Sequence, residues 1–91
     1  MTEDRDVLAR LRKQLADGLP ETEIAVSGGN GRYQVDAAGA VFAGLSAVKR
    51  QQTVYRCIND LIREGTVHAV TIVARTPEER DAAAAQAQAQ D

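Results

Sequence analysis

The chain has 91 residues, of which 44% are hydrophobic, and this length suits one small domain and excludes a second. Charged residues make up 26% of the chain and the net charge is -2, which excludes a globally basic nucleic-acid binder and leaves only a local basic patch for such a role. A single cysteine cannot form an internal disulfide and no apolar run reaches the roughly 20 residues of a membrane span, so we expect a cytoplasmic protein without a membrane partner.

The first predicted element is an amphipathic helix over residues 4–17, which Gly18 is placed to end. Its apolar side chains recur at helical spacing, at Val7, Leu8, Leu11 and Leu15. Two segments of alternating polar and apolar residues then flank the glycine-rich Ser27–Gly31, and together they predict a β-hairpin with one buried face. The apolar positions of this hairpin are Ile24, Val26, Tyr33, Val35 and Ala37. Ser27–Gly31 lacks the lysine and hydroxyl residue of a phosphate-binding loop, so we expect a mobile turn.

A second helix follows a connection around Phe42 and Gly44, with Ser46 placed as its N-cap and its end near Gly65. One apolar stripe runs along it, formed by Val48, Tyr55, Ile58 and Ile62 and flanked by Val54 and Leu61. The next segment, Val67–Ala74, is apolar on both faces of its alternation, which is typical of a strand inside a covered sheet. Strand, helix and strand in this order predict a right-handed crossover.

A last helix begins at Thr76-Pro77-Glu78-Glu79, where a threonine N-cap, a proline at the first helical position and a glutamate at the third coincide. Residues 82–91 form an Ala/Gln-rich tail with no large side chain to anchor it. We therefore expect a single domain over residues 1–81 and a frayed or disordered tail. The predicted order is helix, strand, strand, helix, strand, helix.

Basic residues gather on the second helix. Lys49 and Arg50 lie in its first turn, where the macrodipole disfavours cations. They indicate either a phosphate or acidic-partner site, built with the free backbone amides, or an ordinary solvated helix start. Arg56 and Arg63 could extend this basic face as a nucleic-acid-binding stripe. The acidic residues that interrupt it in sequence are Asp60 and Glu64.

His68 is the only histidine of the chain, and it stands at the start of an apolar segment. The residue pattern alone leaves two interpretations open, a hydrogen-bonded structural histidine or a ligand of a metal or cluster. Cys57 is expected to be a small buried hydrophobe, so a soft-metal site would need ligands from another molecule. The acidic residues Asp36, Asp60 and Glu64 form no paired catalytic motif, and no enzymatic function is predicted.

The block FAGLSAVKRQQTVYRCINDLI, followed by VHAVTIVARTPEE, resembles the BolA family, and the VKRQQTVY form is closest to its acid-stress-linked, IbaG-like branch. The resemblance covers about Glu23–Glu79. It rests on the aromatic-x-Gly motif at Phe42–Gly44, the basic helix start, the His68–Ala69 pair and the Thr76–Pro77 pair. It implies an α+β sandwich related to the class II KH domain, with a three-stranded sheet backed by helices.

The resemblance also implies an adaptor that pairs with a monothiol, CGFS-type glutaredoxin in [2Fe-2S] trafficking and in iron and stress regulation. His68 matches the family's cluster ligand, while the glutaredoxin cysteine and a glutathione thiolate supply others. No cluster is then expected in the isolated chain, which would be a monomer or a weak homodimer. The implied partner surface comprises Arg32, Tyr33, His68 and Ala69.

This chain departs from the family pattern in the hairpin loop, where many members carry a second cysteine or histidine. No residue of Ser27–Arg32 is a good iron ligand. We therefore expect His68 to be the sole strong ligand, with the cluster held weakly, and Arg32 to contact a glutathione carboxylate or an acidic glutaredoxin surface. Some members are described as DNA-binding transcriptional regulators. The alternative function is thus DNA binding through the KH-like fold and a basic helix face of Lys49, Arg50, Arg56 and Arg63.

Overall fold

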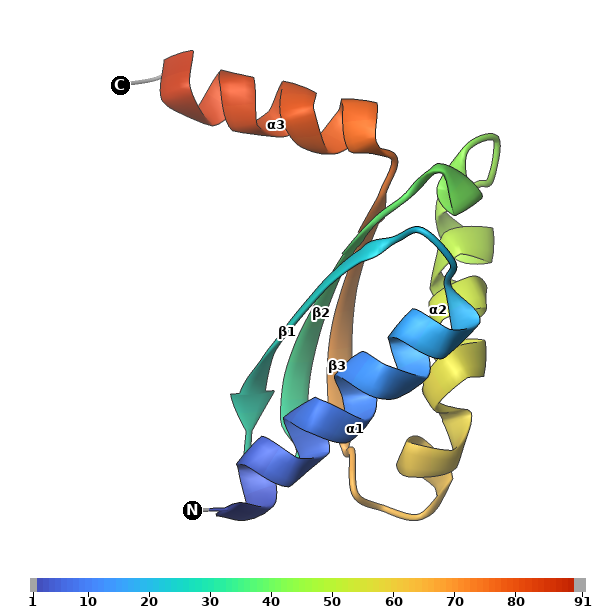
Figure 1. Cartoon of the computed structure of the whole chain (residues 1–91), viewed down its shortest axis with the longest axis vertical. Coiled ribbons are helices and arrows are strands. Elements are labelled where there is room, and N and C mark those ends of the chain that lie inside the picture. The colour runs from blue at the N-terminus through green and yellow to red at the C-terminus, as the bar shows by residue number, and fades with distance from the viewer. Residues whose placement is uncertain (1, 90–91) are drawn as a thin grey trace.

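The computed structural model describes residues 2–89, and its elements follow the order predicted from the sequence (Figure 1). The helices are α1 (Thr2–Gly18), α2 (Ala47–Arg63) and α3 (Pro77–Ala89), and the strands are β1 (Glu23–Gly29), β2 (Arg32–Ala38) and β3 (Ala69–Arg75). A 3-10 turn at Ala40–Phe42 leads from β2 toward α2. The sheet has the order β1-β2-β3, with β1 antiparallel and β3 parallel to β2. The predicted α+β fold with a three-stranded sheet is confirmed.

The hydrophobic core fills the space between the two long helices and one face of the sheet. Helix α1 packs against β1 and helix α2 against β3. Successive side chains of a strand point to opposite faces of the sheet, and paired residues of neighbouring strands share a face. Val35 of β2 pairs with Ile72 of β3, and both are buried on the face that the helices cover. The largest fully buried side chains are Phe42, Leu11, Leu15, Leu19, Ile58, Leu61, Val35, Val54 and Val67.

Strand β3 lies at the edge of the sheet, and its second face is open. Of its residues only Ile72 is buried, whereas Ala69, Thr71 and Arg75 are exposed. The prediction of a strand covered on both sides is therefore wrong. The apolar run predicted cover on both faces, but α1 and α2 both pack on one face, and the residues on the other face that are exposed are Ala69, Thr71 and Arg75.

Two side chains of α2 close the outer edge of β3. Successive carbonyls of a strand point to opposite sides, and the Arg75 carbonyl accepts from the Gly39 N–H on the side of β2 at 2.9 Å. The carbonyls of Ile72 and Ala74 therefore point outward. Gln51 donates to the first at 2.9 Å and Arg50 to the second at 3.2 Å.

The β-hairpin is confirmed, but its turn is shorter than expected. Strand β1 continues through Gly29, so only Asn30 and Gly31 form the turn. Their φ angles are 55° and 81°, which is the left-handed backbone that a type I′ turn needs at both central residues. Ser27, expected to belong to a mobile loop, instead pairs with Gln34 in the ladder.

Helix α3 leaves the end of β3 and projects away from the other two helices (Figure 1). It continues to Ala89, so residues 82–89 are helical and the helix crosses the expected domain end at residue 81 without a break. The helix is continuous because alanine has the highest helix propensity, even without a large anchoring side chain. Residues 90 and 91 of the predicted tail lie outside the described residues. No helix within residues 2–89 is long and apolar enough to cross a membrane.

Candidate functional site

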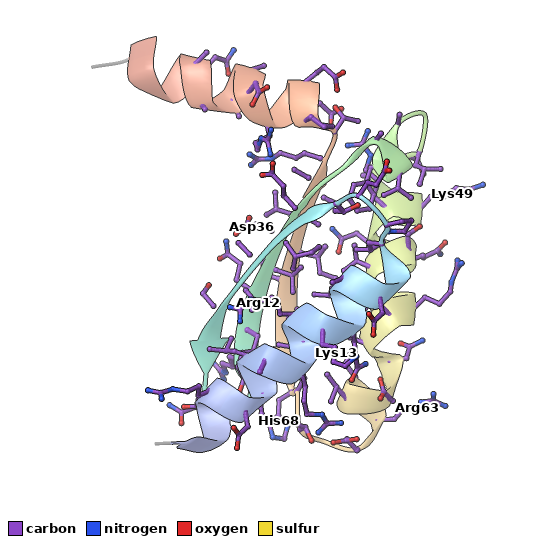
Figure 2. All side chains as sticks on the ribbon, viewed as in Figure 1. Arg12, Lys13, Asp36, Lys49, Arg63 and His68 are labelled. Carbon is purple, nitrogen blue, oxygen red and sulfur yellow. The ribbon has the colours of Figure 1, made fainter. Side chains whose placement is uncertain are left out.

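His68 lies in the connection from α2 to β3, directly before the strand begins, and Figure 2 labels it at the end of the sheet where α1 starts. Its backbone N–H donates to the Gly31 carbonyl at 2.7 Å, and the N–H of Ala69 donates to the same oxygen at 3.0 Å. The side chain is exposed, and its imidazole makes no hydrogen bond or ion pair with another of residues 4–86, whose side chains the structure describes. The interpretation of His68 as a hydrogen-bonded structural histidine is therefore wrong.

A polar hollow surrounds the imidazole. Its lining residues are Asp4, Val7, Asn30, Gly31, Tyr33, Glu64, Gly65, Thr66 and His68. The ring lies close against the hairpin turn, since a Cβ atom built on Gly31 would come within 2.3 Å of His68 Cδ2. At the same hollow, the Glu64 carboxylate accepts from the Thr66 hydroxyl and pairs with Arg10 at 3.1 Å. These two donors, Thr66 first, lower the pKa of Glu64 and keep the carboxylate ionised.

The chain offers one imidazole to a metal and no complete site. Within residues 2–89, no three His, Cys, Asp or Glu side chains lie close enough together to hold a metal ion. Cys57 is half-buried on α2, where its thiol donates to the Thr53 carbonyl at 3.5 Å, and burial raises its pKa. It does not line the hollow at His68. Any cluster at His68 therefore needs its other ligands from a second molecule.

The predicted partner residues separate onto two faces of the sheet. Arg32 of β2 and Ala69 of β3 are paired in the parallel ladder, and both are exposed. Tyr33 points to the helices, is 5% exposed, and donates its hydroxyl to Asp4 Oδ1 at 3.4 Å. The expectation of Tyr33 as a surface contact thus needs correction, because the alternation that exposes Arg32 turns Tyr33 inward.

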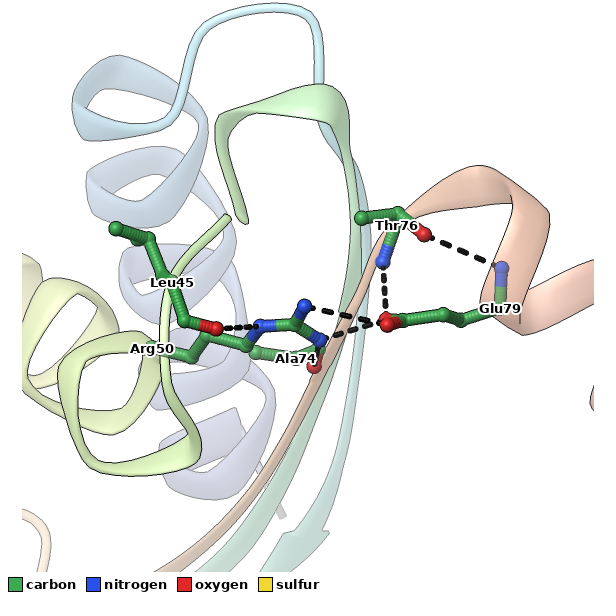
Figure 3. A network of polar contacts seen from close by, with 5 residues as sticks. All are labelled: Leu45, Arg50, Ala74, Thr76 and Glu79. Carbon is green, nitrogen blue, oxygen red and sulfur yellow. Dashed lines mark hydrogen bonds and ion pairs between the residues drawn. The ribbon is translucent and has the colours of Figure 1, made fainter. Parts of the chain in front are cut away.

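Arg50 does not belong to an open anion site, because its guanidinium is engaged within the chain (Figure 3). It forms a two-point pair with the Glu79 carboxylate at 2.6 and 3.2 Å and donates to the carbonyls of Leu45 and Ala74 at 3.1 and 3.2 Å. The bond from Arg50, followed by that from the Thr76 N–H, lowers the pKa of Glu79 to about 2. The anion expected near the start of α2 is thus supplied by the first turn of α3.

The predicted start of α3 is confirmed and takes part in this network. Thr76 Oγ1 accepts from the Glu79 N–H at 3.2 Å, and the Glu79 carboxylate accepts from the Thr76 N–H at 2.9 Å. This is a capping box. Ser46 also caps α2 as predicted, since its hydroxyl accepts from the Lys49 N–H at 3.3 Å.

The remaining cations of α2 form an exposed stripe. Lys49, Arg56 and Arg63 are seven residues apart, which places them about 10 Å apart on one side of the helix, and Figure 2 shows Lys49 and Arg63 pointing outward. None of the three side chains pairs with another of residues 2–89. We call this surface, with the exposed amides between the cations, the basic ridge; it comprises Lys49, Gln52, Arg56, Asn59 and Arg63.

The acidic residues do not interrupt the basic ridge. Asp60 accepts from the Gln14 amide on α1 at 2.9 Å, which lowers its pKa, and Glu64 pairs with Arg10 of α1. Both carboxylates therefore turn toward α1. Sequence reasoning missed Gln52 and Asn59, although their helical spacing between the cations was visible. It also missed Asp4, which no local pattern could single out because the turn that it contacts lies 26 residues away.

The fold and this site define a small α+β domain that presents an exposed histidine, His68, beside a tight turn. The sequence matches the family model described as BolA-like protein over residues 9–79. The acid stress protein IbaG of Escherichia coli K12 is 42% identical over 69 residues, which cover 76% of this chain and 82% of IbaG. The chain belongs to the BolA family.

Solved structures of the same family share the architecture. The BolA domain of SufE1 from Arabidopsis thaliana superposes with a TM-score of 0.72 at 29% identity, over 80% of this chain and 94% of that domain. BolA1 from the same plant gives a TM-score of 0.71 at 26% identity, over 79% of this chain and 93% of BolA1. The order of helices and strands is thus a property of the family.

Proposed function

We propose that this protein is an adaptor that pairs with a monothiol glutaredoxin and shares a [2Fe-2S] cluster with it, in iron–sulfur trafficking and iron or stress regulation. The observation that supports this most is His68, whose backbone is fixed to the hairpin while its imidazole stays exposed and without a partner among the side chains of residues 4–86. An imidazole in this state can bind iron without first breaking a hydrogen bond. We place the function in the cytoplasm and assign the chain a binding role rather than an enzymatic one.

The other ligands would come from the glutaredoxin cysteine and from glutathione. The hairpin turn offers only the Asn30 amide and the Gly31 backbone, which are poor ligands for iron. His68 would be the sole strong ligand on this side, so the shared cluster should be held weakly and be transient. Exposed Arg32 lies beside Ala69 and is suited to contact a glutathione carboxylate or an acidic glutaredoxin surface.

Anaerobic reconstitution tests this proposal. The chain is mixed with a monothiol glutaredoxin, iron, sulfide and glutathione, and visible circular dichroism is recorded for the wild type, His68→Ala and the control Gln34→Ala on the open sheet face. We expect a new chiral cluster spectrum for the wild type and Gln34→Ala, and the spectrum of glutaredoxin alone for His68→Ala. An unchanged glutaredoxin spectrum with the wild type, and no complex, would refute the adaptor function.

A second candidate function is DNA binding through the basic ridge, as part of transcription regulation. The specific observation is that Lys49, Arg56 and Arg63 have no counterion among the described side chains of residues 4–86, while the amides between them can read base edges. The test is DNA affinity as a function of salt for Arg56→Ala and for Arg12→Ala, which removes one exposed charge from α1. If Arg56 binds a phosphate, its replacement reduces the logarithmic salt slope by about 1, and Arg12→Ala does not. Equal slopes would exclude the basic ridge as the contact.

A further inference from the structure

The position of His68 depends on a turn that is held from outside the sheet. The single carbonyl of Gly31 accepts the N–H groups of both His68 and Ala69, at 2.7 and 3.0 Å. The imidazole also lies against this glycine, at a place where a Cβ atom would stand 2.3 Å from Cδ2. Any movement of the Gly31 peptide therefore moves the histidine as well.

Asp4 on α1 holds this turn. Its Oδ1 accepts the Asn30 N–H at 3.1 Å and the Tyr33 hydroxyl at 3.4 Å, so one carboxylate oxygen joins the turn to the first residues of β2. Its Oδ2 lies against the last residue of β1, where a Cβ atom on Gly29 would come within 2.8 Å. The carboxylate thus contacts the hairpin on both sides of Gly31.

Asp4 can act as a fixed support because α1 itself is fixed. Leu11 and Leu15 on the same helix are completely buried, and Val7, one turn beyond Asp4, is 7% exposed. Connecting segments are more mobile than the strands they join, and apart from Asp4 and the hairpin ladder the turn is bonded only at the Gly31 carbonyl, by the His68 and Ala69 N–H groups, among the contacts of residues 4–86. The Asp4 carboxylate supplies the restraint at the tip.

We propose that Asp4 is a positioning residue for His68: it fixes the Asn30–Gly31 turn, and through the Gly31 carbonyl it holds the imidazole in the orientation in which a partner-bound cluster meets it. This inference rests on the proposed function for what the orientation serves. The positioning itself is a property of the isolated chain and is measured there.

The test uses three variants of the full chain. Asp4→Ala removes both acceptor oxygens, Asp4→Asn keeps one carbonyl acceptor at the same place, and Asp6→Ala removes an exposed carboxylate from the same helical turn as a control for charge and helix start. In the isolated proteins, amide hydrogen exchange is followed at Asn30, His68 and Ala69. The contact between the His68 ring and Gly31 is followed by proton NMR, and the lifetime of the cluster is measured in the complex with glutaredoxin.

For Asp4→Ala we expect the Asn30 and His68 amides to exchange about fivefold to tenfold faster, as for the loss of one hydrogen bond of ordinary strength, and the ring contact with Gly31 to weaken. The cluster lifetime should shorten by a similar factor, with recovery in Asp4→Asn and no change in Asp6→Ala. Unchanged exchange and ring contact in Asp4→Ala would overturn the inference. If wild type forms no shared cluster, the proposed function fails, and the exchange and ring measurements still decide whether Asp4 positions His68.

Discussion

Replacing Gly31 by alanine should displace the imidazole of His68 more than it destabilises the fold. Gly31 has a φ angle of +81°, and a residue with a Cβ atom pays about 1–2 kcal/mol in this left-handed region. The new methyl group would also stand 2.3 Å from His68 Cδ2, which is far inside contact distance. Because His68 is exposed, its side chain can rotate away from the new methyl group. The clash should therefore lower the unfolding free energy little but change the orientation of the imidazole.

Gly44 provides a matched control for the backbone term. Its φ angle is +77°, and a Cβ atom at this position would meet nothing within 4 Å. Gly44→Ala therefore carries the same strain without the contact. We expect both variants to lose about 1–2 kcal/mol of unfolding free energy in urea titrations. Only Gly31→Ala should change the NMR signals of the His68 ring and weaken the shared cluster in visible circular dichroism. Ring signals that stay the same in Gly31→Ala would refute the packing argument for the site.

Three further outcomes concern the fold. Glu79→Gln should lower the melting temperature at pH 7. Because the pKa of Glu79 falls from 4.5 to about 2 on folding, the stabilisation that its carboxylate gives is complete above pH 4.5, and the difference in melting temperature from wild type should shrink as the pH is lowered toward 2. A difference that does not depend on pH would contradict the ion pair with Arg50. Leu11→Ala, at a fully buried position, should cost about 2–5 kcal/mol in urea unfolding, and a loss below 1 kcal/mol would show that α1 packs less tightly than described. Ser46→Ala should cost about 0.5–2 kcal/mol through loss of the cap to Lys49, with a control Ser27→Ala expected to be near neutral.

Local signals predicted the order of the elements well. The helical spacing of α1, the N-cap at Ser46 and the capping box at Thr76 depend only on residues a few positions apart, and the structure contains all three. The hairpin turn shows the limit of such signals. Glycines at 28, 29 and 31 suggested a long mobile loop, yet the Asn30-Gly31 pair alone satisfies a type I′ turn and leaves the other two glycines in the ladder.

The site depended on contacts that a linear pattern does not contain. Arg50 and Glu79 were noted for separate reasons, but their pairing requires that β3 return antiparallel along α2 and bring the start of α3 to the start of α2. The exposure of the His68 side chain could not be predicted, because this residue stands one position before the strand, where the alternation of faces has not yet begun. Asp4 and Asn30 meet only because α1 crosses the end of the hairpin.

The capped edge of β3 has a consequence for how copies of this chain meet at high concentration. An unpaired edge strand is a template for another strand, and natural proteins suppress this route to aggregation by covering or charging the edge. Here Gln51 and Arg50 occupy the outward carbonyls of Ile72 and Ala74, so an incoming strand would have to displace an amide and a charged guanidinium before it could extend the sheet. Since Arg50 is itself held by Glu79, loosening of α3 would remove one of the groups that fix the guanidinium at this edge and would weaken its cover.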